Sequence, residues 1–319
     1  MNVEAAEILS ARTIDFHAHA ILPSYIDALK ILKIAAAEEE GFPLPKWTAE
    51  NHLQFMDAAG IDFTILSMAT PHISDSAAVR AINEEFAELC RRFPKKFGFV
   101  ATLPFPNVES SIEEFYYATE KLGALGVKVA SNSDGVYLGD EQLAPIFAEL
   151  NKKSSIVIIH PSPAKLLPRK NVVTGNVMAL FEYPADTTRA VLNLLANGTL
   201  AKFPDLKFIV PHCGSFLPYM KQRADAMFQM LAAMNLMEPV NFYDSVGKLF
   251  FDTAGDPMPE QFDMLTKIAN LDKIILGTDY PYVPAQVVLR KKKLFDAELL
   301  QRSLTEKIYV DNARSLLGG

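Results

Sequence analysis

Short apolar runs rich in β-branched residues recur along the chain, and each is followed by a longer segment with apolar residues at helical spacing. This alternation is typical of β-α units around a parallel sheet, because parallel strands are buried on both faces. Helices are predicted between the runs, the clearest over residues 76–93 and 109–122. We predict eight strands, over residues 13–19, 63–68, 97–102, 126–130, 156–160, 207–212, 249–253 and 273–279.

Eight strands of this kind form either an open doubly wound sheet or a closed barrel. Polar side chains stand at the carboxyl ends of the first, fifth, sixth and eighth strands: His17, His19, His160, His212 and Asp279. Residues so far apart in strand order converge on one point only if the sheet closes. No GxGxxG or P-loop sequence follows the first strand. The sequence therefore predicts an α/β protein with the (β/α)8 fold of a TIM barrel.

The length of 319 residues exceeds that of most single domains, but barrels of this type reach ~250 residues or more as one unit. No Pro/Gly/Ser linker is present, so we predict one domain over residues 1–319. Three connections, 20–50, 161–186 and 213–248, are longer than a barrel needs and leave the expected active-site face. They are predicted to form the walls or lid of a substrate pocket and to contact a second subunit in a homodimer.

Composition excludes several kinds of partner. The net charge is −7, and the only tight basic run, residues 290–293, is interpreted as a solvated helix face, so neither nucleic acid nor an anionic membrane is expected as a partner. Cys90 and Cys213 are far apart and outside any CxxC spacing, which argues against disulfides and a structural zinc site. No apolar stretch approaches the ~18 residues of a membrane span, and Glu4 and Glu7 replace a basic leader. A cytoplasmic protein is expected.

His17 and His19 close the first predicted strand one residue apart, so both imidazoles point to the same side of the strand. Neutral imidazoles in this chelating arrangement suit zinc, iron, cobalt or nickel, and an added carboxylate favours harder ions. His160, His212 and Asp279 each end an apolar run. Any one of them could be a buried structural residue, but four of the six histidines at strand ends beside an aspartate predict a catalytic centre there.

The two remaining histidines have different surroundings. His52 falls in a helix that starts near Thr48 and is interpreted as structural. His72 follows Pro71 in the loop after the second strand, where it could contact substrate or simply be solvated.

Several motifs resemble the amidohydrolase superfamily and, within it, the amidohydrolase-2 branch that contains aminocarboxymuconate-semialdehyde decarboxylase. The resemblance spans nearly the whole chain. It rests on IDFHAH at 14–19, MDAAGID at 56–62, IHP at 159–161, PDLKFIVPH at 204–212, GSF at 214–216, FDTA at 251–254 and LGTDYP at 276–281.

The resemblance implies a ligand set and a catalytic residue. His17, His19, His160 and Asp279 would bind one divalent metal, zinc in the first place and manganese as an alternative. His212 would stand beside the metal as an acid/base group. Three histidines and one carboxylate leave an open position for water or a substrate oxygen, as a catalytic metal requires.

The chain also departs from the decarboxylases of this branch. They use a basic residue in the loop after the first strand to hold a substrate carboxylate, yet no arginine lies between Ala20 and Gln54, which leaves only lysines there. Arg223 falls in a segment that reaches a neighbouring subunit in some relatives. It could clamp a carboxylate in trans or form an ordinary helix salt bridge.

Lys128 ends the fourth predicted strand, where dinuclear members of the superfamily carry a carboxylated lysine. A modified Lys128 would bridge two metals and indicate a hydrolase. An unmodified lysine would point into the substrate pocket or the barrel interior.

Three functions follow in order of preference. The first is a metal-dependent carboxy-lyase that removes carbon dioxide non-oxidatively from a small aromatic or unsaturated acid, with Asp279 or His212 handling the proton. The alternative is hydrolysis of a small lactone, ester or amide by a metal-bound hydroxide. The third is a catalytically silent binding protein, which the intact set of polar positions disfavours.

Overall fold

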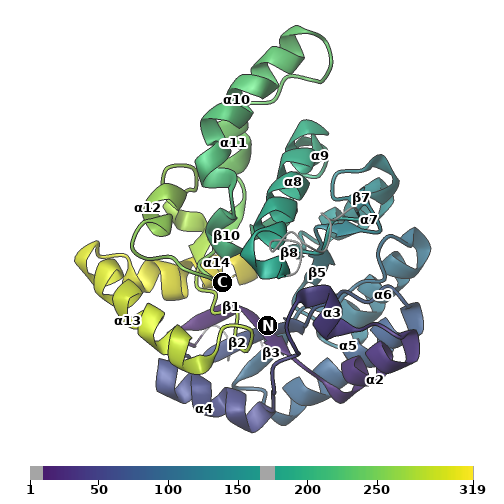
Figure 1. Ribbon diagram of the computed structural model, residues 1–319, viewed down its shortest axis with the longest axis vertical. Helices are drawn as coiled ribbons and strands as arrows, with labels where there is room; N and C mark the ends of the chain where they lie inside the picture. The colour runs from purple at the N-terminus through teal and green to yellow at the C-terminus, as the bar shows by residue number, and fades with distance from the viewer. Residues whose placement is uncertain (1–9, 166–176, 319) are drawn as a thin grey trace.

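The computed structural model describes residues 10–165 and 177–318 (Figure 1). Within them, parallel strands surround the centre of the molecule and helices cover the outside. The barrel strands are β1 (Ile14–Ala20), β2 (Phe63–Met68), β3 (Phe97–Phe99), β4 (Ala101–Thr102), β5 (Val127–Ala130), β8 (Ile156–His160), β9 (Lys207–Val210), β10 (Phe250–Asp252) and β11 (Ile274–Ile275). A small antiparallel pair, β6 (Asn132–Ser133) and β7 (Val136–Tyr137), extends the loop after β5.

Backbone hydrogen bonds close these strands into a barrel. β3 and β4 together form the third strand of the barrel. β3 pairs with β2, and β4 pairs with β5 on the other side. Between them, Val100 donates its N–H to the carbonyl of Leu66 in β2. The order then continues through β8, β9, β10 and β11. Phe16 N donates to the carbonyl of Leu276 (2.9 Å) and His19 N to that of Tyr280 (2.8 Å), which joins β1 to the segment after β11. The predicted TIM barrel is confirmed.

Helices alternate with the strands, and both helices singled out in the sequence are present. Asp75 and Asn107 cap the two by accepting hydrogen bonds from Ala78 N and Ser110 N. The α-helices are α2 (Pro23–Leu32), α3 (Ala36–Glu40), α4 (Ala49–Ala59), α5 (Ser76–Arg92), α6 (Val108–Lys121), α7 (Ala144–Lys152), α8 (Glu182–Ala196), α9 (Thr199–Lys202), α10 (Leu217–Ala233), α11 (Phe242–Val246), α12 (Gln261–Leu265), α13 (Ala285–Gln301) and α14 (Asn312–Leu317).

The sixth, seventh and eighth strands are shorter than the sequence predicts, and two of them end before a predicted site residue. The sixth barrel strand ends at Val210 instead of His212, and the eighth ends at Ile275 instead of Asp279. Neither predicted end residue has strand geometry, because His212 (φ 56°) and Asp279 (φ 60°) adopt the left-handed conformation, which lies outside the β region.

Strand alternation explains which side chains reach the barrel interior. Ile156 and Ile158 of β8 pack in a cluster that the C-terminal helix α14 covers, whereas Val157 and Ile159 pack against the outer helices. His160 lies two residues beyond Ile158 and therefore points inward, above the apolar floor. The same period of two places Asp252 above Phe250 in β10.

A buried carboxylate fixes the ends of β5 and β8. Asp186 of α8 accepts hydrogen bonds from Asn132 Nδ2 (2.9 Å), Arg189 Nη1 (2.8 Å) and the Ser131 hydroxyl. Ser131 in turn donates its N–H to the carbonyl of His160 (2.8 Å). The network holds the strand end that carries His160.

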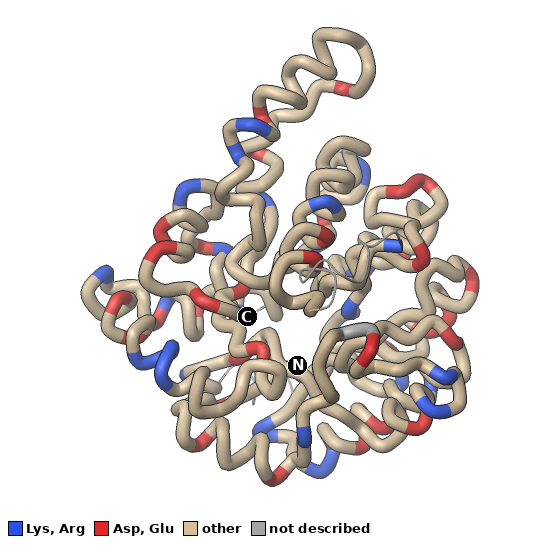
Figure 2. Tube along the Cα trace, viewed as in Figure 1, with Lys and Arg blue, Asp and Glu red and all other residues tan. Residues whose placement is uncertain are grey.

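Charged residues of both signs are interspersed around the outer helices (Figure 2). In the part of the chain that is described, no helix has both the length and the apolar character needed to cross a membrane.

Candidate metal centre

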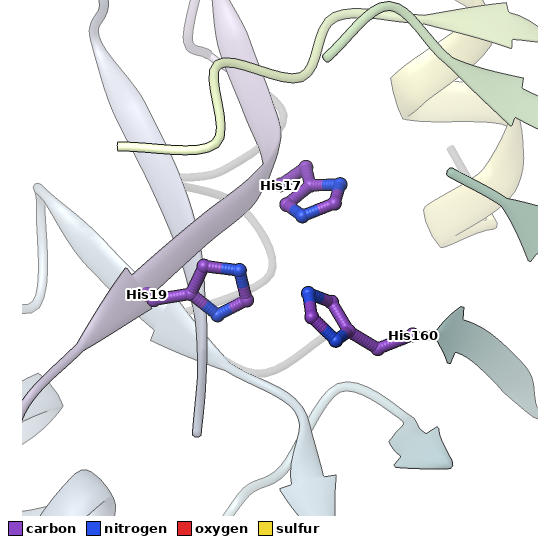
Figure 3. Close-up of side chains that lie close together, drawn as sticks. All are labelled: His17, His19 and His160. Carbon is purple, nitrogen blue, oxygen red and sulfur yellow. The ribbon is translucent and has the colours of Figure 1, made fainter. Parts of the chain in front are cut away.

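Three imidazole rings meet at the carboxyl ends of β1 and β8 (Figure 3). His17, His19 and His160 are 2 %, 0 % and 5 % exposed, and each offers a ring nitrogen within 4.8 Å of the others. Their ring centroids are 4.8–5.5 Å apart. Residues separated by more than 140 positions in the sequence thus face one point, as the closed sheet requires.

Asp279 brings a carboxylate to the same point. Its Oδ1 lies 3.6 Å from His17 Nε2 and 3.4 Å from His19 Nε2. Its Oδ2 lies 3.6 Å from His212 Nε2. The left-handed backbone is held because Asp279 N donates to the carbonyl of His17 (2.7 Å), which ties the turn to β1. His212 also groups with His17 and Asp279 within ligand distance.

The Nδ1 atoms of the three histidines are all engaged by the surrounding protein. His17 Nδ1 donates to Asp252 Oδ2 (2.7 Å), His19 Nδ1 to the carbonyl of Met68 (3.2 Å), and His160 Nδ1 to that of Pro161 (3.1 Å). In the neutral form of each ring, this arrangement leaves Nε2 as the lone-pair atom. The Nε2 atoms of His17 and His19 are buried without a hydrogen-bond partner among the described residues, so a bound cation fits the site.

Charge and burial shift the histidine pKa values in opposite directions in the metal-free chain. Burial lowers the pKa of His17, but the carboxylates of Asp252 and Asp279 outweigh it and raise the value to about 9. Burial lowers the pKa of His19 to about 4 and, with the positive charge of Lys128, lowers that of His160 as well. Burial opposes ionisation of Asp279, yet the neighbouring imidazoles of His19, His212 and His17 outweigh it and lower its pKa overall. His19 and His160 are therefore neutral near pH 7, the form that binds metals.

Asp252 is part of the candidate site, although the sequence alone did not point to it. Besides holding His17, its other oxygen accepts hydrogen bonds from the N–H groups of His212 (2.9 Å) and Ala254 (3.0 Å). One buried carboxylate thus orients a candidate ligand and the backbone of the candidate acid/base residue. Its place at a strand end, within the FDTA motif, was the available signal.

Replacing Asp252 with asparagine is expected to weaken metal affinity ~10–100-fold, because a carboxylate that orients a histidine ligand also raises its basicity. Competition with a chromogenic chelator measures the affinity. Wild-type affinity in Asp252→Asn would contradict the assigned role. Asp263→Asn, which changes an exposed carboxylate on α12, is the matched control.

A cavity of about 500 Å³ opens above this centre and reaches His160, His212 and Asp279. All three long connections contribute to its walls, as predicted, and its aromatic lining consists of Phe42, Tyr183, Phe216 and Tyr282.

None of the three weaker substrate-contact predictions lines this cavity in the single chain. Lys128 is buried, and its Nζ donates to the carbonyl of Met68, which also accepts from His19. Burial lowers the pKa of His72 to about 3, and Arg223 is exposed on α10. His52 is buried and accepts a hydrogen bond from Trp47 Nε1 (2.9 Å), in agreement with a structural role.

The fold and the site define the class of (β/α)8-barrel proteins with a histidine-rich centre at the carboxyl ends of the strands. The family model for amidohydrolases matches residues 14–319, and the chain belongs to this family. The resemblance identified from the sequence motifs is confirmed.

Relatives of known name include decarboxylases. Decarboxylase yanB of Aspergillus niger is 30 % identical over 312 residues, covering 92 % of this chain and 84 % of the relative. The 6-methylsalicylic acid decarboxylase of Penicillium expansum is 28 % identical over 294 residues, 89 % of each chain. A solved amidohydrolase II matches with a TM-score of 0.87 and 32 % identity over 96 % of this chain and 100 % of its own.

A 5-carboxyvanillate decarboxylase of Novosphingobium aromaticivorans, solved with manganese, shares the fold. Its TM-score is 0.83 at 21 % identity, over 98 % of this chain and 97 % of its own.

Proposed function

We propose that this protein is a metal-dependent carboxy-lyase that removes carbon dioxide non-oxidatively from a small aromatic or unsaturated carboxylic acid. The observation that carries the proposal is the juxtaposition of His212 and Asp279 with three converging imidazoles at an aromatic-lined cavity that reaches His160, His212 and Asp279. The decarboxylases among its relatives support this reaction over hydrolysis.

His17, His19, His160 and Asp279 would hold one divalent ion. Three imidazoles and a carboxylate suit zinc, and manganese is the alternative. When bound, such an ion supplies Lewis-acid polarisation of a substrate oxygen, which favours the build-up of negative charge on the ring as carbon dioxide leaves.

His212 is placed to deliver the proton that replaces the carboxylate. Its side chain is 20 % exposed within the cavity, and its backbone is fixed by Asp252. The carbon–carboxylate bond breaks, carbon dioxide departs, and the electron pair left on carbon takes a proton from the His212 imidazolium. Asp279 is the poorer donor because its pKa is lowered by His19 and His212. Water at the cavity returns the proton to His212.

Aromatic walls suit a planar substrate. The Tyr282 hydroxyl donates to the carbonyl of Thr70 (2.9 Å) and accepts from its N–H (3.1 Å), which fixes the ring beside His19 and Phe42. Such rigid rings pack against an aromatic acid and exclude water around the carbon that loses carbon dioxide.

The reaction is tested by loading purified protein with zinc or manganese and supplying hydroxybenzoates and muconate-type acids. Release of carbon dioxide with stoichiometric formation of the decarboxylated product is expected for at least one acid. Hydrolysis of lactones or amides without carbon dioxide release from any acid would overturn the proposal.

We also propose that the protein is a homodimer joined through α10, the helix that projects from the barrel in Figure 1. Ala224 and Phe228 are buried on one side of this helix. Met227, Met230 and Met234 are exposed at helical spacing along a different side of the helix, which is an apolar stripe of the kind that covers a partner surface. Arg223 lies one turn before Met227 on the same stripe, so it would reach a neighbouring subunit.

Replacing Met230 with glutamate is expected to shift the mass measured by light scattering from a dimer toward a monomer, because the charge would be buried in the interface. Gln222→Glu, an exposed change on the same helix, is the control and should remain dimeric. A wild-type monomer would contradict the dimer.

The trans role of Arg223 has its own test. A heterodimer of Arg223→Ala and His212→Asn chains has one site with both defects and one with neither if Arg223 acts in trans. Activity should then return, and its continued absence would show that Arg223 does not serve the neighbouring site.

A further inference from the structure

Lys291 is the only lysine or arginine among the described residues that line the cavity. It lies on α13, and its Nζ donates to the carbonyl of Gly255 (3.1 Å) and is 2.6 Å from Asp256 Oδ1. Gly255 and Asp256 belong to the loop after β10 and also line the cavity. The side chains of Lys291 and Asp256 are 24 % and 64 % exposed, so the pair lies in a more solvent-exposed part of the lining than the buried His160.

Asp256 determines what this ammonium group can bind. Its carboxylate compensates the charge of Lys291, and the Gly255 carbonyl occupies a second N–H, so the pair as a whole is neutral. A substrate carboxylate at this end could take the third N–H of the ammonium group only while facing the like charge of Asp256. A neutral substituent that donates a hydrogen bond, such as a hydroxyl or an amide, meets no repulsion. Ser215 and Gln261 add neutral polar groups to the same lining.

We propose that the Asp256–Lys291 pair selects aromatic acids with a single carboxylate over those with two. The substrate then carries the carboxylate that it loses near the histidines and a neutral polar group at its other end. This inference rests on the proposed decarboxylation and adds the charge class of the substrate. Removal of the Asp256 charge frees Lys291 for a second carboxylate, so the preference for acids with one carboxylate should fall. General damage to the site would lower activity toward both kinds of acid and would not produce this change.

The test compares two acids that differ in charge but hardly in size: 2-hydroxybenzoate with a carboxamide at C5 and 2-hydroxybenzoate with a carboxylate at C5. Metal-loaded full-length protein is assayed for kcat/KM by carbon dioxide release and for Kd by calorimetry. Wild type is expected to prefer the carboxamide by ~10-fold or more, from the repulsion between carboxylates a few ångströms apart near a protein surface.

Two variants give opposite expectations. Asp256→Asn should bring the ratio of the two acids to about one, a change of ~10-fold, and Lys291→Gln should raise the preference for the carboxamide further, because Asp256 is then uncompensated. Asp272→Asn is the matched control, since Asp272 is 66 % exposed, pairs with Lys307 and precedes β11 at the opposite end of the barrel. It should leave the ratio unchanged.

Equal treatment of the two acids by wild type, or a ratio that Asp256→Asn does not move, would overturn the charge selection. The two proposals fail separately. If neither acid loses carbon dioxide, the reaction is wrong for them, and the calorimetric Kd values still decide whether charge selects the ligand. If neither acid binds, the charge selection is wrong as well.

Discussion

Replacing Asp279 with asparagine is expected to reduce both metal content and decarboxylation by more than ~100-fold, beyond the loss expected for a residue that only orients a ligand. Asp279 contributes the carboxylate that lies within 3.6 Å of His17, His19 and His212. Asparagine is the appropriate substitute because φ is 60° at this position, and asparagine tolerates the left-handed conformation that alanine resists.

Metal content by elemental analysis and kcat/KM by carbon dioxide release measure the two losses. The thermal unfolding midpoint of the metal-free variant should stay close to that of metal-free wild type, which separates loss of the site from loss of the fold. An Asp279→Asn protein that keeps stoichiometric metal and full activity would contradict the ligand assignment.

Replacing His212 with asparagine should have a different signature. Metal content is expected to remain stoichiometric while kcat falls ~10²–10⁴-fold, the range for removal of a general acid. Asparagine again suits the backbone, because φ is 56° at His212. Its N–H should still donate to Asp252, so the neighbouring ligands keep their support.

Asp279→Asn and His212→Asn together distinguish a residue that binds the metal from one that transfers the proton. A solvent deuterium isotope effect on kcat that is present in wild type should change in His212→Asn, because the proton donor to carbon is then different. Loss of metal from His212→Asn would instead make His212 a ligand, a role compatible with its distance from Asp279 but not with the division of labour proposed above.

Local sequence pattern was sufficient for the fold. Apolar runs such as residues 156–160 carry the two-residue alternation of a buried strand, and this alternation determines that His160 points inward. The pattern failed at the ends of the sixth and eighth strands, because hydrophobicity does not report a left-handed φ at His212 or Asp279. It also missed the break at Val100, where the strand changes its pairing partner.

The site was predictable where its residues carry distinctive chemistry. His17 and His19 share one side of one strand, and chelating histidines at that spacing are visible in the sequence alone. Asp252 was not assigned, although it ends a strand within the FDTA motif, because its contact with His17 spans 235 residues and does not show in the sequence.

Lys291 was not predicted as a site residue, for a different reason. It stands in the basic run 290–293, which the sequence analysis interpreted as a solvated helix face. That interpretation does not hold for Lys291, because the packing of α13 beside the loop after β10 turns this side chain toward the cavity. Only tertiary structure distinguishes it from its neighbours.

The central claim is that one metal ion at this site is required for decarboxylation. The most direct test strips the protein with a chelator, restores zinc or manganese in steps, and follows carbon dioxide release from 2-hydroxy-6-methylbenzoate or from an acid that the wild-type protein is shown to decarboxylate. Activity is expected to be absent in the stripped protein and to rise linearly to a plateau at one equivalent per chain. Full activity in the stripped protein, or a plateau only at two equivalents, would contradict the account.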